Sequence, residues 1–184
     1  MDKYRAFIAI DIPCFPKLVE IEKELKDTGA DIKLVEPENI HITLKFLGDI
    51  STDISQEIKK IIEESVKNYK AFEIKLSNIG VFPSKEYIKI IWIGIQDTDT
   101  LKNIAENIDK KINQIGFKRE KRPFSAHLTI GRVKNAKNKE KIIQIINKYQ
   151  NVDFFKLKVK EIILKKSTLT PKGPIYSDIE KIKI

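Results

Sequence analysis

Hydrophobic residues along this chain recur with two periods, one of two residues and one close to 3.6 residues. The first period is typical of strands with one buried face, and the second is typical of amphipathic helices. We therefore expect strands at 4–12, 32–35, 40–47, 72–81, 87–95, 126–133, 152–165 and 175–182. Helices are expected at 15–26, 53–69, 97–115 and 137–149. The short connections favour mostly antiparallel sheets, because parallel strands need long crossovers.

The order of the predicted elements in the first half of the chain returns in the second half, which indicates an internal duplication. Residues 5–12 align with residues 88–95, and the histidines His41 and His127 each follow a proline by four residues. We expect one α+β domain over residues 1–184, with approximate halves 1–84 and 85–184 related by a pseudo-two-fold axis. Such an axis would bring the two histidines to opposite sides of one cleft.

Composition narrows the class of protein. Hydrophobic residues make up 41% of the 184 residues and charged residues 33%, as in an ordinary globular domain. No apolar stretch approaches the roughly 18 residues needed to span a bilayer, so we expect a cytoplasmic protein. The single cysteine, Cys14, excludes an internal disulfide. A net charge of +9 favours an anionic partner such as nucleic acid, a nucleotide or an acidic membrane.

The two histidines of the chain begin matching motifs, His-Ile-Thr-Leu at His41 and His-Leu-Thr-Ile at His127. Strand alternation places each histidine on the same face as the threonine two positions later, Thr43 or Thr129, and turns the apolar residues to the opposite face. A single histidine on a strand is more often structural than catalytic. Two copies of one motif favour a shared catalytic site.

Two histidines at one site suit the hydrolysis of a phosphodiester near neutral pH. A neutral imidazole takes a proton from water and an imidazolium gives one to the leaving oxygen. The hydroxyls of Thr43 and Thr129 can donate hydrogen bonds to the phosphate oxygens. This scheme needs no metal ion and no cofactor, although Glu36 and Glu38 flank the first motif and leave a metal-dependent alternative open.

Basic side chains near the motifs are candidates for binding phosphate. Arg132 would clamp phosphate, but strict alternation puts it on the apolar face, so this assignment requires a bulge near Gly131. Lys45 lies on the His41 face by alternation and is expected to line the cleft. Arg122 belongs to a basic run, 118–122, that can attract an RNA backbone. For Arg132 and for the basic run, a solvated side chain is the alternative. Aromatic candidates for stacking a base are Phe7, Phe46, Trp92, Phe124 and Tyr176, most of them expected in the core.

These motifs together resemble the two-histidine (2H) phosphoesterases, and within them the RNA 2′,3′-cyclic phosphodiesterases, also called 2′-5′ RNA ligases. The resemblance covers nearly the whole chain, through residues 5–10, 41–48, 80–83, 122–124, 127–132 and 169–176. One departure is Ala126, where relatives commonly have proline. The resemblance implies a bilobal fold with an antiparallel sheet in each half, helices outside and a central basic cleft.

The resemblance also implies a reaction, the hydrolysis of an RNA 2′,3′-cyclic phosphate to a 2′-phosphate. His41 would be the proton donor to the leaving 3′ oxygen and His127 the proton acceptor that activates water. Thr43, Thr129 and Arg132 would hold the phosphate. The expected partners are RNA ends, including those of tRNA fragments, and the expected state is a monomer.

Three alternatives stay open at this point. The same site can act on a small cyclic nucleotide or a 2′-5′ oligonucleotide, and it can join RNA through 2′-5′ linkages. A protein of another class, an RNA-binding module without catalysis, would use the +9 charge and keep the histidines as structural residues. A metal-dependent enzyme is the third.

Overall fold

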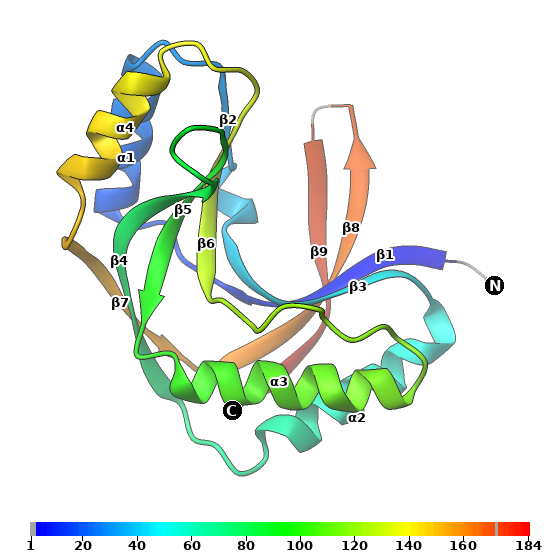
Figure 1. Ribbon diagram of the computed structural model, residues 1–184. Helices are drawn as coiled ribbons and strands as arrows, with labels where there is room; N and C mark the ends of the chain where they lie inside the picture. The colour runs from blue at the N-terminus through cyan, green and yellow to red at the C-terminus, as the bar shows by residue number, and fades with distance from the viewer. Residues whose placement is uncertain (1–2, 172) are drawn as a thin grey trace.

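The computed structural model describes residues 3–171 and 173–184, and nearly all predicted elements are present with small differences at their ends (Figure 1). The first seven are β1 (Lys3–Asp11), α1 (Pro16–Asp27), β2 (Ile32–Leu34), β3 (His41–Ser51), α2 (Ser55–Val66), β4 (Phe72–Pro83) and β5 (Ile88–Gln96). They are followed by α3 (Asp99–Gln114), β6 (His127–Val133), α4 (Lys139–Lys148), β7 (Asp153–Val159), β8 (Glu161–Thr170) and β9 (Gly173–Lys183). Short 3-10 turns at Pro37–Asn39 and Thr52–Ile54 flank β3.

One predicted strand is wrong: residues 152–165 form two strands, not one. β7 pairs with β4, whereas β8 pairs with β1 and β9, and the exposed Lys160 lies between them. The sequence here mixes β-branched and aromatic residues with charged ones throughout and contains neither glycine nor proline. Local preference therefore gives no sign of the point where the chain leaves one sheet for the other.

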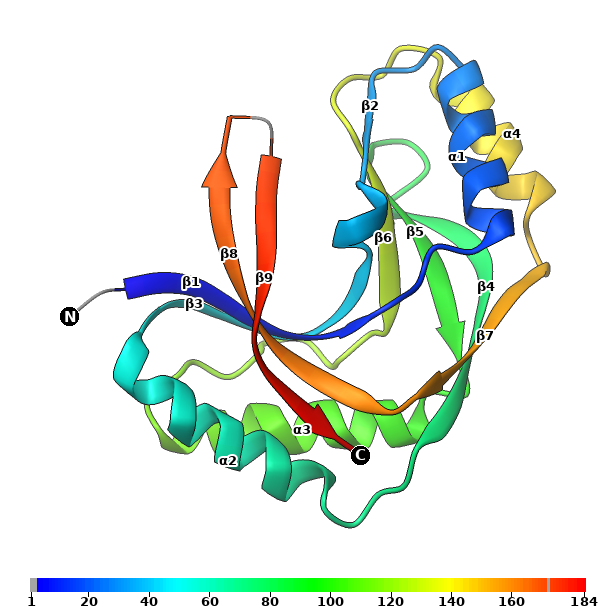
Figure 2. The same cartoon turned by 180° about the vertical axis from the view of Figure 1, so that it is seen from behind.

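All strand pairs are antiparallel, as predicted, and they build two sheets. Sheet A has the order β3-β1-β8-β9, and sheet B has the order β2-β6-β5-β4-β7. The two motif strands, β3 and β6, each pair with the strand that begins their half of the chain. The architecture is α+β with helices on the outside of each sheet (Figures 1 and 2).

The two halves of the chain are interleaved and do not correspond to the two sheets. Strands β8 and β9 come from the second half and complete sheet A, while β4 comes from the first half and lies in sheet B. The helices cross over in the same way: α1 lies beside α4, and α2 beside α3 (Figures 1 and 2). The boundary near residue 84 therefore separates two sequence repeats and not two lobes.

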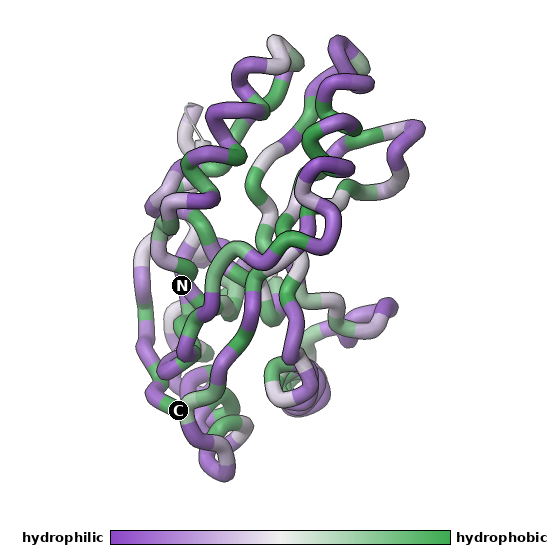
Figure 3. The backbone as a smooth tube through the Cα atoms, turned by 90° about the vertical axis from the view of Figure 1, so that its left-hand side faces the viewer, coloured by the Kyte–Doolittle hydropathy of each residue, from purple (hydrophilic) through white to green (hydrophobic). Residues whose placement is uncertain are grey.

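Isoleucine and leucine dominate a cluster of buried residues that joins both sheets to the helices. In α3 the buried positions Leu101, Ile104, Ile108 and Ile112 recur at helical spacing, which gives the helix one apolar stripe. The same alternation of hydrophobic and hydrophilic segments is visible along the tube in Figure 3. Burial of these stripes fixes the helices on the sheets and leaves the motif faces of β3 and β6 for other contacts.

Candidate active site

Each histidine is the first residue of its motif strand, and the strand register repeats from one motif to the other. Asp11 lies opposite His41, and Gly94 lies opposite His127. Likewise, Ala9 lies opposite Thr43, and Trp92 lies opposite Thr129. Residues 5–12 and 88–95, aligned by sequence, thus have equivalent partners in space. The strand register is therefore the same around both motifs, as the predicted internal repeat requires.

The predicted faces of the two motifs are confirmed as well. Ile42 and Leu128, which follow the histidines, are fully buried, whereas both histidines and both threonines are partly exposed. The apolar residues anchor each strand in the core. One imidazole and one hydroxyl remain on the open face of each strand.

Both imidazoles are held by the same local device, which sequence reasoning missed. Nδ1 of His41 lies 2.7 Å from the carbonyl oxygen of Asn39, and Nδ1 of His127 lies 2.8 Å from that of Ser125. A carbonyl oxygen only accepts, so Nδ1–H donates in both cases and Nε2 is the nitrogen that can exchange a proton with a bound group. In each motif the carbonyl belongs to the residue two positions before the histidine.

His41 packs among aromatic rings. Its ring centroid lies 4.9 Å from that of Phe7 and 5.2 Å from that of Tyr176, the latter at an interplanar angle of 87°. Burial lowers the pKa of His41, and the Asn39 carbonyl and the Asp11 carboxylate oppose that shift without cancelling it. The neutral imidazole is therefore favoured in the unliganded protein.

A buried lysine, Lys165, forms ion pairs with two carboxylates near His41. Nζ of Lys165, a residue only 4% exposed, lies 2.8 Å from both carboxylate oxygens of Asp11 and 2.7 Å from Asp178. Asp11 favours the protonated form of His41, whereas Lys165 disfavours it. Lys165 thereby limits how far Asp11 can raise the pKa of His41. These three partners come from β1, β8 and β9, and no local motif identifies them.

His127 has its own aromatic neighbours. Its ring meets Phe82 edge-on, with centroids 5.2 Å apart, and Phe82 lies 5.1 Å from Trp92. The indole of Trp92 lies against the backbone of Gly80, where any side chain would collide with it. Glycine at this position of β4 therefore makes room for the tryptophan beside the second motif.

Arg132 reaches the motif face through a bulge in β6, as its assignment required. Thr129 lies opposite Trp92 and Gly131 opposite Ile91, so Ile130 is the extra residue and the alternation changes beyond it. Arg132 is exposed on the same face as Thr129. The charge of Arg132 acts on Tyr176 in the other sheet. Burial raises the pKa of Tyr176, and the positive charge of Arg132 partly offsets that rise. Tyr176, which contacts His41, thus links the two motifs.

The placement predicted for Lys45 is wrong. A bulge at Leu44 reverses the alternation in β3 and turns Lys45 into the core, where it is 3% exposed. Its Nζ donates to Asp109 at 2.6 Å and to the carbonyl of Lys118 at 2.7 Å, with Glu120 at 3.4 Å. A lysine this buried requires such partners.

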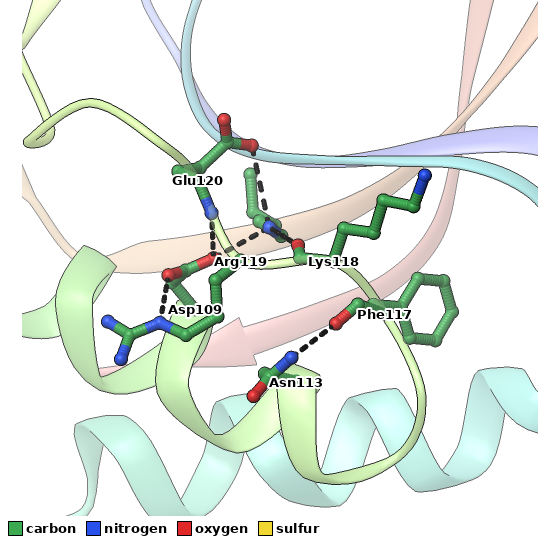
Figure 4. Close-up of polar contacts among 7 residues, drawn as sticks. Asp109, Asn113, Phe117, Lys118, Arg119 and Glu120 are labelled. Atoms are coloured by element: carbon green, nitrogen blue, oxygen red, sulfur yellow. Dashed lines mark hydrogen bonds and ion pairs between the residues drawn. The ribbon is translucent and has the colours of Figure 1, made fainter.

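Figure 4 shows Asp109 and the segment after α3 that it holds in place. Asp109 also accepts hydrogen bonds from Nε of Arg119 at 3.0 Å and from the backbone N–H of Glu120 at 3.2 Å. Burial alone would raise the pKa of Asp109, but these donors together lower it. The ion pair fixes the segment that leads from α3 towards the second motif.

Arg122 is exposed in this segment. Its role in binding RNA stays a prediction. Among residues 3–171 and 173–184, no three His, Cys, Asp or Glu side chains lie together as metal ligands would. Helices long and apolar enough to cross a membrane are likewise absent there. Two surface hollows lie between α1 and α4 and between α2 and α3, and neither includes a histidine.

Comparison with solved structures gives the same fold. The crystal structure of E. coli LigT complexed with 3′-AMP matches with a TM-score of 0.74 at 19% identity, over 100% of this chain and 99% of that one. A crystal structure of a Thermus thermophilus protein matches with a TM-score of 0.80 at 22% identity, over 97% of each chain. These identities establish similarity of fold.

Comparison of sequences gives the family. This chain is 44% identical over 179 residues to the RNA 2′,3′-cyclic phosphodiesterase of Methanocaldococcus jannaschii, covering 96% of this chain and 99% of that protein. It is 38% identical over 184 residues to the protein of the same name from Methanothermobacter thermautotrophicus, covering 99% and 100%. The family model of the 2′-5′ RNA ligase superfamily matches residues 20–168. The resemblance inferred from the motifs is confirmed, and the chain belongs to the 2′-5′ RNA ligase superfamily of two-histidine phosphoesterases.

Proposed function

We propose that this protein is an RNA 2′,3′-cyclic phosphodiesterase, a hydrolase that opens the terminal cyclic phosphate of RNA and leaves a 2′-phosphate. The observation that carries the proposal is the matched pair of histidines, His41 and His127, each with Nδ1 held by a carbonyl and Nε2 left for the reaction. Relatives of this name share 38% and 44% of residues over nearly the whole chain. The net charge of +9 suits an RNA partner.

In the proposed reaction the two histidines exchange their protonation states. Nε2 of neutral His127 accepts a proton from water as the water oxygen bonds to phosphorus. The bond between phosphorus and the 3′ oxygen breaks, and Nε2–H of protonated His41 donates a proton to that oxygen. The product carries a 2′-phosphate and a 3′-hydroxyl. Each proton transfer contributes on the order of 10² to 10⁴ to the rate.

Three further side chains hold the phosphate in this proposal. The hydroxyls of Thr43 and Thr129 share faces with the histidines and donate to non-bridging oxygens as charge develops there. The guanidinium of Arg132, turned to the same face by the bulge, binds these oxygens through two parallel N–H donors.

The low pKa of His41 is compatible with its role as proton donor. Burial makes the imidazolium a stronger acid than in water, which favours transfer of its proton to the leaving oxygen. An anionic phosphate beside Nε2 favours the imidazolium and offsets the desolvation. Substrate binding therefore favours protonation of His41, which is mainly a neutral imidazole in the free protein.

The proposal extends to RNA ends such as those of tRNA fragments, and to a monomeric, cytoplasmic enzyme. It also extends to reversible 2′-5′ ligation, because a 5′-hydroxyl that replaces water in the same displacement yields a 2′-5′ linkage. Both extensions use the same two histidines and need no further group.

The test identifies the phosphate isomer formed from RNA that ends in a 2′,3′-cyclic phosphate, in excess chelator. We expect the 2′-phosphate only. The variants His41→Ala and His127→Ala should each lower the single-turnover rate by about 10²-fold or more, with folding and RNA affinity retained. A 3′-phosphate product, full activity in either variant, or loss of turnover with the chelator would contradict the proposal.

A further inference from the structure

Phe46 is the most exposed of the large apolar side chains in the described part of the chain, at 68%. A single exposed phenylalanine is ordinary on a protein surface. Its position is not ordinary: the bulge at Leu44 turns Phe46 to the face of sheet A that carries His41, where it pairs across the strands with Phe7. The side chain thus lies open on the same face as the reacting group.

Phe46 extends a row of rings that begins at the catalytic histidine. The centroids of His41 and Phe7 are 4.9 Å apart, and those of Phe7 and Phe46 are 6.3 Å apart. Phe7 is only 3% exposed, because the rings of His41 and Tyr176 pack against it. Along this row the open aromatic surface therefore begins one ring beyond the histidine. A base stacked on Phe46 is therefore separated from His41 by the ring of Phe7.

Positive charge borders Phe46 on the β1 side. Arg5 precedes Phe7 by two residues in β1 and so lies on the same face. Its side chain is 54% exposed, and its ion pair with Asp49 is long, at 3.9 Å. An exposed ion pair of this length contributes little to stability, so the guanidinium can bind a phosphate at small cost.

A second group of cations is anchored beside the edge of sheet A that β3 forms. Lys45, the neighbour of Phe46 in β3, binds the carbonyl of Lys118 and so fixes the start of the segment that leaves α3. Besides Arg119, which pairs with Asp109, this segment carries the exposed basic side chains Lys118, Lys121 and Arg122. An open ring flanked by cations is the combination that binds single-stranded RNA, with stacking for the base and charge for the backbone.

We propose that Phe46 is a second base-binding position, on which the base immediately 5′ of the cyclic-phosphate terminus stacks while Arg5 binds the phosphate joining the two nucleotides. The inference rests on the proposed function and specifies its substrate as RNA of at least two nucleotides, preferred over a 2′,3′-cyclic mononucleotide. Every base has a π face, so the preference is for length and not for sequence.

The experiment measures kcat/KM for a 2′,3′-cyclic mononucleotide and for a trinucleotide ending in the same cyclic nucleotide. Wild-type protein should favour the trinucleotide, and Phe46→Ala should reduce that preference by about 5- to 50-fold. Phe46→Trp should retain the preference and Phe46→Leu should lose it, because leucine keeps apolar surface but offers no ring. Tyr87→Ala, which removes another aromatic side chain that is 60% exposed, should leave the preference at the wild-type value.

The outcomes separate the two proposals. If wild-type protein hydrolyses both substrates equally well, or if Phe46→Ala keeps the wild-type preference, the second base-binding position is wrong while the hydrolase proposal stands. If wild-type protein hydrolyses neither substrate, the proposed function itself is wrong. Unchanged thermal unfolding of the Phe46 variants, expected for so exposed a side chain, excludes misfolding as the cause of any change.

Discussion

The bulges of β3 and β6 lie at equivalent positions of the two motifs, yet they bring different chemistry to the surface. In β3 the bulge at Leu44 turns Lys45 into the core and Phe46 outward. In β6 the bulge at Ile130 turns Gly131 inward and Arg132 outward. One backbone irregularity thus gives the first motif an exposed ring and the second an exposed guanidinium.

The two inward positions differ because their neighbours differ. β3 is the edge strand of sheet A, and Lys45 reaches past that edge to Asp109 of α3. β6 is covered by β2, and a side chain at Gly131 would meet Ile32 at 3.0 Å. A duplicated backbone therefore fixes which positions turn inward or outward. The neighbouring element decides which residue each position can hold.

Among changes at the bulges, the largest effect is expected on kcat/KM from Arg132, the outward residue of the second motif. Arg132→Phe makes this motif resemble the first and should lower kcat/KM on RNA with a cyclic phosphate end by about 10²-fold, because the phosphate loses a charged two-point contact. Arg132→Lys keeps the charge without the fork and should lose about 10-fold. Steady-state kinetics with both variants measure these losses. Values within about twofold of wild type would show that the bulge in β6 has no role in binding phosphate.

An intermediate effect is expected at the inward position of the first motif. Lys45→Met leaves Asp109 with Arg119 and one backbone donor, and should lower the free energy of unfolding by about 2 kcal/mol. Urea denaturation measures the change. The matched control is the double variant Lys45→Met with Asp109→Leu, which leaves no buried charge unpaired and should recover part of the loss. Wild-type stability of the single variant would contradict a structural role for the ion pair.

The smallest expected effect is on the pH dependence of stability, and it reports the burial of His41. Burial lowers the pKa of folded His41, so unfolded protein binds more protons between that value and about 6.5. The free energy of unfolding should therefore fall as pH drops through this window, and His41→Asn should remove that part of the slope. Denaturation of the wild-type protein and of this variant at several pH values measures the slope.

NMR titration gives a direct check on the same group. The imidazole of His41 should titrate below about 6.5 in free protein and at a higher pH once a 2′-phosphate product is bound, because the anion favours the imidazolium. A free-protein pKa at or above this ordinary value would contradict the assigned effect of burial.

Most of the fold was predictable from local pattern, because the periods of apolar residues report burial directly. The strands and helices, the antiparallel pairing and the open faces of His41 and Thr43 all follow from short-range alternation. The exception at Lys160 arises where two strands of similar composition meet without a turn residue. The site was predictable as far as the alternation stayed regular, which is why Lys45 was placed on the wrong face.

The sequence by itself determined that two copies of one strand motif exist and that each offers an imidazole and a hydroxyl. Only the tertiary structure decided that bulges reverse the alternation beyond each threonine, that the two halves are interleaved, and that Lys165 stands behind His41. The physical reason is the distance along the chain over which each feature is determined. Alternation is set by neighbouring residues, whereas bulges, strand order and buried ion pairs depend on partners far away in the chain.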